Sequence, residues 1–479
     1  MDEKMLIIHG YSDGSSSFTS LKDFFIKEAK FKRDNVYFVD YSSMDDQSTF
    51  RDFADKLDFE YSNLFRKGTR INVACHSTGA LIVRIWLALR RQRQKELGQI
   101  IDCPVKRIFM LAPANFGSDL AKMGQSFLGK VRSTFFNSNS RKEDPWESGK
   151  IVLQGLEPAS PFQWNLSNFD LYEEDYFSKK SPPERRCYPF IFAAGNSYKG
   201  LQARVVKQRK KPGTDGTVRI CGTTLNTRKC TIPFLGEDVI PTWSKENKFF
   251  DIPFAVFNNF NHGSMINTGF GAMEGAKIKS RFMAPFGPGL LILKALRVKD
   301  EINYAKISKT FRTYSDENYK NMADQYKERY QQFFFSVRDD VNKKVDDYYL
   351  DFYVVNSSGK MLKGLSDQVD EKLEANIYTH SEDKSCRVMM INYDKILPLF
   401  EDMKKKQAKL VFDISAKPLT RDIEFKKGRC VIYDGSAQGG KNGKFPAFLY
   451  PNTTTLVDII LNRVQSKSIL NVKNQVNKK

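Results

Sequence analysis

One short stretch, residues 70–84, constrains this chain more than any other. An apolar run from Ile71 to Ala74 predicts a buried strand, and the apolar-periodic segment from Ala80 to Leu89 predicts a helix. Between them the chain reads Cys75-His-Ser-Thr-Gly79, so it must turn sharply with a serine at the apex. Small residues are required beside that serine, because the strand and helix backbones nearly touch in such a turn.

A strand that turns abruptly into a helix at a serine is the layout of a nucleophile elbow. The turn pushes the hydroxyl of Ser77 out above the sheet and makes it the candidate nucleophile. The usual pattern is Gly-x-Ser-x-Gly, and here Cys75 takes the place of the first glycine. We predict that Cys75 packs as a small buried hydrophobe with no role in the chemistry.

Strands and helices alternate along the first two hundred residues. Buried-strand patterns cover 4–9, 35–40, 71–74, 105–112 and 187–195, and helical spacing covers 18–31 and 50–65. This alternation predicts an α/β fold with a mainly parallel sheet that is covered by helices on both faces. Sites in such sheets form at the carboxyl ends of the strands.

Residues 117–186 break the alternation and predict a lid or cap inserted over the sheet. The insertion holds seven large apolar residues that could cover an acyl site or could equally form the ordinary core of a cap: Phe127, Phe135, Phe136, Trp146, Phe162, Trp164 and Phe169. Asn115 and Phe116 lie at its entrance and are predicted to bind substrate.

Three segments are expected along the chain. Residues 1–300 form the α/β catalytic domain, and residues 301–346, with a helical stripe of tyrosines, form a connecting helical segment. Beyond it, short alternating segments between turn signals predict a C-terminal all-β sandwich at 347–479. This last domain is a candidate for binding lipid or a protein partner.

A net charge of +20 indicates an anionic partner, either a membrane surface or nucleic acid. Nucleic acid is not expected, because no recognised motif is present. Solubility alone is the alternative explanation of the charge. The chain has no long apolar run and no leader, so we expect a cytoplasmic product without a transmembrane helix. Peripheral membrane association and non-classical secretion are left open.

The few cysteines and histidines argue against a metal centre. Seven Cys show no paired spacing, and there are only 4 His, so neither a disulfide framework nor a zinc site is indicated. We expect no cofactor and no metal.

A serine hydroxyl is a weak nucleophile near neutral pH and needs a base, an acid that orients the base, and oxyanion donors. His76 lies beside the serine and its side chain is expected to point elsewhere. His9 belongs to the end of the first strand, and His380 to the predicted β domain. This leaves His262, in a loop after an apolar strand, as the base.

The acid is expected between the serine and the histidine in chain order. Asp215, in Gly-Thr-Asp-Gly-Thr-Val, is the leading candidate, because it follows a turn and has small neighbours. Asp238 and Asp251 are the alternatives. The oxyanion donors are expected to be the backbone N–H groups of Thr78, directly after the nucleophile, and Tyr11, after the first strand.

Several segments together resemble the α/β-hydrolase lipases. They are His9-Gly10, Cys75-His-Ser-Thr-Gly79, Leu111-Ala-Pro-Ala-Asn-Phe-Gly-Ser118, Asp215-Gly-Thr-Val218 and the loop of His262. The run Thr214-Asp-Gly-Thr-Val-Arg-Ile-Cys-Gly-Thr-Thr-Leu-Asn226 is similar to bacterial phospholipase-like hydrolases, which include some secreted toxin lipases. The resemblance implies Ser77, Asp215 and His262 as a catalytic triad. It also implies Tyr11 and Thr78 as oxyanion donors.

The expected activity is hydrolysis of carboxylic esters of lipids, of the phospholipase A or lipase type, at a membrane surface. The expected substrate is a phospholipid or another lipid ester. Two alternatives stay open: a thioesterase or deacylase of acylated proteins, and a non-catalytic membrane- or nucleic-acid-binding protein on a hydrolase scaffold. The oligomeric state is not predicted.

Overall fold

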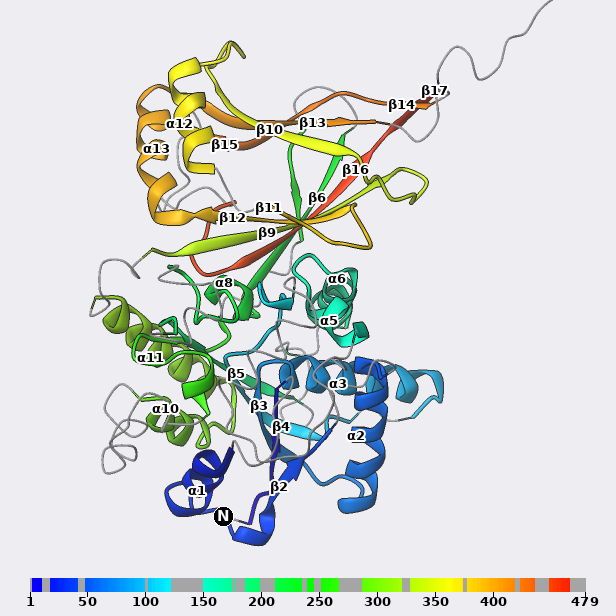
Figure 1. Ribbon diagram of the computed structural model, residues 1–479, viewed down its shortest axis with the longest axis vertical. Helices are drawn as coiled ribbons and strands as arrows, with labels where there is room; N and C mark the ends of the chain where they lie inside the picture. Colours follow the sequence, from blue (N-terminus) through cyan, green and yellow to red (C-terminus); the bar gives the residue numbers. More distant parts are fainter. Residues whose placement is uncertain are drawn as a thin grey trace, which may run out of the picture. The chain divides into compact units, whose positions relative to one another are not determined.

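The computed structural model divides the chain into two compact units (Figure 1). Unit 1 comprises Met1–Thr227, Glu246–Arg329 and Asn452–Thr454, and unit 2 comprises Arg228–Lys245, Tyr330–Pro451 and Thr455–Lys479. The structure describes residues 2–10, 18–41, 48–99, 102–121, 150–174, 177, 186–198, 212–234, 239–244, 251–266, 287–320, 328–373, 377–417, 423–435 and 448–465.

A six-stranded parallel sheet forms the centre of unit 1. In spatial order its strands are β2 (Val36–Val39), β1 (Met5–Ile8), β3 (Ile71–His76), β4 (Val105–Leu111), β5 (Tyr188–Ala194) and β8 (Phe254–Phe257). Every neighbouring pair is parallel. All of β3 and β5 is buried, as expected for strands that are covered on both faces. The predicted α/β architecture is confirmed.

Helices cover both faces of this sheet (Figure 1). On one face lie α2 (Phe50–Leu64) and α3 (Gly79–Glu96); on the other lie α1 (Thr19–Lys27), α10 (Pro288–Ala295) and α11 (Glu301–Lys320). Successive residues of a strand point to opposite faces of the sheet. Ile108 therefore packs in the cluster with α2 and α3, and Phe109 in the cluster with α1, α10 and α11. No helix within the described ranges is long and apolar enough to cross a membrane.

Local sequence signals explain where α2 begins. Thr49 and Asp52 form a capping box in which each side chain accepts a hydrogen bond from the backbone N–H of the other residue. Short elements complete unit 1: η2 (Arg33–Asn35), α8 (Ile220–Thr223) and η7 (Gly263–Met265). The last two lie in the loops that carry the candidate acid and base.

The described part of the predicted lid is helical. It contains α5 (Lys150–Leu156), α6 (Pro161–Ser167) and the π-helical turn η4 (Asn168–Glu173). Phe162 stacks on Phe50 with 5.0 Å between the ring centroids, and Phe169 packs against the cluster around α2 and α3. These contacts favour the interpretation of a packed cap core for both residues. Phe127, Phe135, Phe136 and Trp146 lie outside the described residues.

Unit 2 has its own apolar core. One sheet has the order β11-β12-β9-β16-β6-β7, a second has β10-β13-β15, and β14 pairs with β17. The strands are β6 (Thr227–Phe234), β7 (Thr242–Trp243), β9 (Tyr330–Asp339), β10 (Tyr348–Val355), β11 (Ile377–Thr379), β12 (Cys386–Asn392), β13 (Lys409–Ala416), β14 (Ile423–Phe425), β15 (Arg429–Asp434), β16 (Thr454–Leu461) and β17 (Arg463–Gln465). The predicted C-terminal sheets are present.

Two helices in unit 2 depart from the all-β prediction. They are α12 (Lys363–Leu373) and α13 (Tyr393–Lys405), and both pack into the core of the unit. In α13 the buried residues Ile396, Leu399, Phe400 and Met403 recur at helical spacing. The sequence of residues 393–405 therefore carries a helical pattern, but it lies between segments with strand patterns, which led to the all-β prediction.

The limits of the compact units also differ from the boundaries expected from the sequence. The strands β6 and β7 come from the middle of the chain and join the sheet of unit 2. The predicted connecting helix corresponds to α11, but residues 330–339 form strand β9 instead of continuing it. Phe333, Phe335 and Val337 all belong to one buried apolar cluster. This period of two is typical of a strand and not of a helix.

Candidate active site

Strand β3 passes into helix α3 through Ser77 and Thr78. Ser77 has a φ of 53°, in the left-handed region that residues with a side chain adopt only under constraint. Its N–H donates to the Leu111 carbonyl at 3.1 Å, and its carbonyl accepts from the Ala114 N–H at 3.1 Å. The end of β4 and the loop that follows it therefore hold the serine in its strained conformation.

Two glycines allow the backbones to approach one another at this turn. A Cβ atom on Gly79 would lie 2.7 Å from the His9 carbonyl oxygen and 3.0 Å from the Ile8 carbonyl oxygen. A Cβ atom on Gly10 would lie 2.8 Å from the Cβ of Ser77. Both positions require glycine, because neither backbone nor nucleophile can shift without losing the geometry of the turn.

Cys75 occupies the position where the usual elbow pattern has its first glycine. The side chain is fully buried in the apolar cluster between the sheet and helices α2 and α3. Burial raises the pKa of the Cys75 thiol well above its ordinary value of 9.0, so the thiol stays protonated. The residue packs as the small buried hydrophobe that the sequence predicts.

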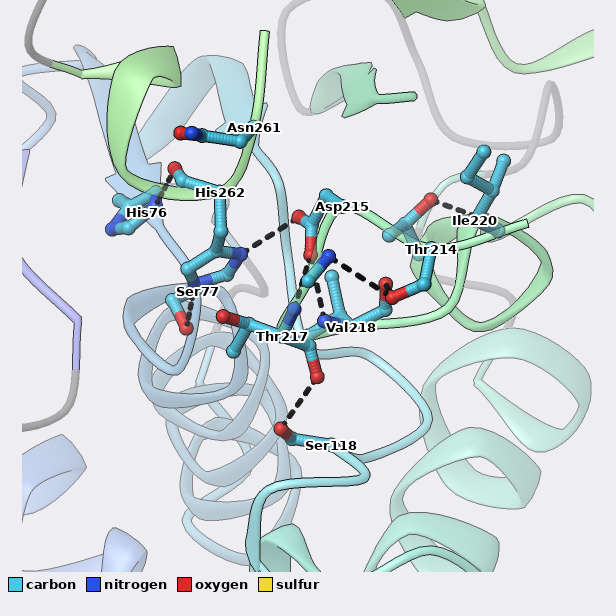
Figure 2. A network of polar contacts seen from close by, with 12 residues as sticks. His76, Ser77, Ser118, Thr214, Asp215, Thr217, Val218, Ile220, Asn261 and His262 are labelled. Atoms are coloured by element: carbon cyan, nitrogen blue, oxygen red, sulfur yellow. Dashed lines mark hydrogen bonds and ion pairs between the residues drawn. The ribbon is translucent and has the colours of Figure 1, made fainter. Parts of the chain in front are cut away.

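The His262 ring lies between Ser77 and Asp215 and is within hydrogen-bond distance of both side chains (Figure 2). The Nε2 atom of His262 is 3.0 Å from Ser77 Oγ, and its Nδ1 atom is 2.8 Å from Asp215 Oδ2. An ionised carboxylate only accepts hydrogen bonds, so Nδ1 carries the proton and Nε2 is free to accept from the serine hydroxyl. Ser77 and His262 are each 7% exposed and Asp215 is 1% exposed, which limits competition from water.

The Asp215 loop uses both carboxylate oxygens. Oδ1 accepts from the backbone N–H groups of Thr217 and Val218, each at 2.8 Å, while Oδ2 faces His262. Ser118 Oγ in turn donates to the Thr217 carbonyl at 2.8 Å (Figure 2). The carboxylate orientation is therefore fixed from within the loop and from the segment after β4.

His262 lies in a turn that follows strand β8. Its backbone N–H donates to the Asp215 carbonyl at 3.2 Å. Asn261 and Ser264 close the turn, because Ser264 Oγ accepts from the Asn261 N–H at 2.8 Å and Asn261 Oδ1 accepts from the Ser264 N–H at 2.9 Å. The candidate base is thus held against the candidate acid by main-chain as well as side-chain contacts.

Comparisons with known proteins give a match at the level of structure. No family model matches the chain, and no curated protein sequence matches it. Two solved structures are similar over the whole chain: the phospholipase PlaB from Legionella pneumophila, at 22% identity and a TM-score of 0.78, and the same phospholipase in complex with thio-NAD, at 21% and 0.77. Each match covers 100% of this chain and 97% of the other. This chain has an α/β-hydrolase fold. The parallel sheet and the elbow of unit 1 are the parts of the molecule that define it.

In an α/β-hydrolase the residue after the nucleophile supplies one oxyanion donor. Thr78, at the start of α3, follows the candidate nucleophile, and no hydrogen bond among the described residues uses its backbone N–H. Tyr11, the predicted second donor, lies outside the described residues and stays a prediction. Gly10, directly before it, lies against Ser77, as a second donor segment requires.

Asn115 and Phe116, the predicted substrate-binding residues, are both buried. Asn115 Nδ2 donates to the Thr223 carbonyl at 2.7 Å, and its Oδ1 accepts from the Arg84 guanidinium at 3.3 Å. The backbone N–H of Phe116 donates to the Gly222 carbonyl at 3.0 Å. These contacts indicate that the two residues join the loop after β4 to α8, and the predicted contact with substrate gains no support from them.

Of the two alternative acids, Asp238 lies outside the described residues. Asp251 is exposed to solvent before strand β8, and the hydrogen bond to His262 Nδ1 comes from Asp215 instead.

Arg84 is a buried charge near the site that the sequence predictions did not include. It donates two hydrogen bonds to Asp170, at 2.7 and 3.0 Å, and one to Ser167 at 3.2 Å. The pair is almost inaccessible to solvent and links the elbow helix α3 to the cap. A single arginine inside the apolar run 80–89 was the signal, because a charge in a buried helix requires a partner.

His76 is a second residue whose place could not be predicted. Its ring does not point away from the site, because Nε2 lies 3.1 Å from the backbone carbonyl of His262. The two imidazole rings are 4.6 Å apart between centroids. Nothing in the local pattern of the elbow indicated this contact across 186 residues of sequence.

Proposed function

We propose that this chain is a serine hydrolase that cleaves carboxylic esters of lipids, of the phospholipase A or lipase type. The observation that carries the proposal is the continuous hydrogen-bonded path from Asp215 through His262 to Ser77. A nucleophile, a base and an orienting carboxylate in this order are the components of serine hydrolase catalysis. The strained position of Ser77 on the elbow supports the same assignment.

In the acylation step His262 Nε2 takes the proton of the Ser77 hydroxyl while Oγ attacks the ester carbonyl carbon. The negative charge that forms on the carbonyl oxygen accepts hydrogen bonds from the backbone N–H of Thr78 and, in this proposal, of Tyr11. The imidazolium then gives its proton to the alcohol oxygen, the ester C–O bond breaks, and the acyl group stays on Ser77. Asp215 stabilises the imidazolium and keeps the ring in the required tautomer.

Deacylation repeats the same proton path with water. His262 Nε2 takes a proton from the water molecule, the hydroxide attacks the acyl carbonyl, and the proton returns to Ser77 Oγ as the acyl C–O bond breaks. The products are a carboxylic acid and the free serine. No step in this scheme needs a group beyond the residues of the chain and water.

Two observations support a lipid as the substrate. The similar solved structures are described as a phospholipase. The net charge of +20 favours an anionic membrane surface, where each Lys or Arg close to the lipid contributes about 1 kcal/mol. In this proposal unit 2, which has its own core, is a candidate for contact with lipid or with a protein partner.

The test measures hydrolysis of a short-chain nitrophenyl ester and covalent labelling by a fluorophosphonate probe, for the wild-type protein and for Ser77→Ala. We expect the substitution to lower kcat/KM roughly ten-thousandfold or more, since the nucleophile is removed. Covalent labelling by the probe should disappear in the same variant. A thermal melt serves as the control that Ser77→Ala is folded.

The other interpretations give different results. A folded wild-type protein that neither hydrolyses the ester nor reacts with the probe would indicate a binding protein on a hydrolase scaffold. Faster turnover of acyl thioesters or acylated peptides than of phospholipid would indicate the thioesterase or deacylase. Full ester hydrolysis by Ser77→Ala would overturn the proposed nucleophile.

A further inference from the structure

His76 precedes the candidate nucleophile directly, and its side chain is buried with 2% of the residue exposed. It is the last residue of β3, and it lies in register with Leu111 of β4. Its backbone is therefore part of the rigid sheet, and the main chain on its C-terminal side is clamped through Ser77. A side chain on such a backbone has a well-defined position.

The Nε2 atom of His76 contacts the backbone carbonyl oxygen of His262 at 3.1 Å (Figure 2). A carbonyl oxygen only accepts, so Nε2 must carry the proton and donate. The Nδ1 atom then presents a lone pair, and it has no hydrogen-bond partner among the described residues. The contact with His262 is thus the feature that selects the tautomer of His76.

The His262 backbone is held at both of its polar groups. Its N–H donates to the Asp215 carbonyl at 3.2 Å, and its carbonyl accepts from His76. The first contact joins the base to the acid, and the second joins the base to the residue that is covalently bonded to Ser77. The His76 side chain therefore links the backbone next to the nucleophile to the backbone of the base.

We propose that His76 is a positioning residue that holds the His262 loop, through its Nε2–H, at the distance from Ser77 that proton transfer requires. This role rests on the proposed function, because it is defined relative to Ser77 and His262. The group acts through His262 and does not itself touch the reacting atoms.

The electrostatic environment agrees with a neutral donor. Burial lowers the pKa of His76 well below its ordinary value of 6.5, and the neighbouring His262 lowers it further. A neutral imidazole keeps one N–H for the carbonyl and adds no positive charge beside the base. A charged His76 would disfavour the imidazolium that His262 must become during the reaction.

Three substitutions separate the hydrogen bond from the packing of the ring. His76→Gln places an amide N–H near the position of Nε2, His76→Asn places one near the position of Nδ1, and His76→Phe keeps a ring against Phe18 and His262 without a donor. Only the glutamine variant can reach the His262 carbonyl. The two amide variants therefore form a matched pair of similar polarity.

The experiment measures kcat and KM on a soluble nitrophenyl ester for these variants, with Ser77→Ala alongside. We expect kcat to fall about 10- to 100-fold in His76→Phe and His76→Asn, since a displaced base loses its attack geometry. KM should stay within about twofold, and His76→Gln should recover kcat to within about threefold of the wild type.

The inference is overturned if all three variants keep wild-type kcat, if all three lose it equally, or if the change appears in KM and not in kcat. Should His76→Phe fail to fold, the comparison of His76→Gln with His76→Asn decides alone. Failure of the proposed function is seen separately, as full activity of Ser77→Ala. Activity that depends on Ser77 but not on the residue at position 76 removes only the positioning role.

Discussion

The proposed nucleophile and its two proposed partners are held in place by different kinds of contact. Ser77 belongs to one continuous strand–turn–helix segment, and backbone groups at the end of β4 and in the segments that follow β1 and β4 surround it. His262 is 185 residues further along the chain, and hydrogen bonds across the loops, most of which involve a side chain, hold it to Asp215 and to the elbow. We expect the elbow to be sensitive to added atoms, and the two loops to be sensitive to lost hydrogen bonds.

The strongest test of this contrast is Gly79→Ala. An added Cβ would meet the carbonyl oxygens of His9 and Ile8, at the end of strand β1, at 2.7 and 3.0 Å, and neither can move without displacing the sheet. We expect kcat/KM to fall about a hundredfold. We also expect a loss of stability of about 1–3 kcal/mol from overpacking. This loss would appear although alanine favours a helix by about 1 kcal/mol over glycine.

Gly364→Ala is the matched control, because Gly364 is also in the first turn of a helix, α12, and a Cβ there would meet nothing within 4 Å. Chemical denaturation should show unchanged or slightly higher stability for this variant. Equal stability and equal activity of Gly79→Ala and Gly364→Ala would show that the close backbone approach at the elbow does not require glycine.

Ser118→Ala tests the loop side of the contrast. The substitution removes the hydroxyl that donates to the Thr217 carbonyl, next to the N–H groups that hold Asp215. We expect kcat to fall about tenfold, because the loop that carries Asp215 should be displaced slightly. We expect stability to fall by about 1–2 kcal/mol, because a buried carbonyl loses its partner.

Ser366→Ala in unit 2 is the control for that variant. Ser366 Oγ accepts from the Val354 N–H at 3.0 Å and donates to the Leu362 carbonyl at 3.1 Å, so it loses similar contacts away from the site. It should reproduce the loss of stability with unchanged kcat. Equal kcat in the two variants would show that the Ser118 contact does not act on the acid.

Cys75→Gly should have the smallest effect on activity. The side chain packs into the core beside the elbow, so its loss leaves a small cavity and costs about 1–2 kcal/mol of stability. Activity on the nitrophenyl ester should stay within a few-fold of the wild type, measured well below the melting temperature. A collapse in kcat would mean that Cys75 supports the elbow in a way that glycine cannot.

The same contrast explains what could be predicted from the sequence. The elbow and the parallel sheet are encoded by local periodicity, so the strands around Ser77 were predicted close to their observed limits. Asp215 and His262 were found through chain order and elimination, and the structure places them within hydrogen-bond distance of each other.

The rest depends on contacts that no local pattern encodes. His76 was expected to point away, yet it reaches a carbonyl 186 residues distant. Asn115 was predicted to bind substrate, but its side-chain amide forms hydrogen bonds with Arg84 and with the Thr223 carbonyl. Strands β6 and β7 lie within the sequence of the predicted catalytic domain but add to another sheet, because a sheet recruits strands by edge pairing irrespective of their distance in sequence.

We propose that Ser77, activated by His262 and Asp215, cleaves lipid esters. The most direct measurement incubates wild-type protein and Ser77→Ala with mixed phospholipid vesicles and identifies the products by mass spectrometry. We expect equal amounts of free fatty acid and lyso-phospholipid from the wild type, and neither product from the folded variant. Equal release by both proteins, or no release by a folded wild type bound to the vesicles, would contradict this proposal.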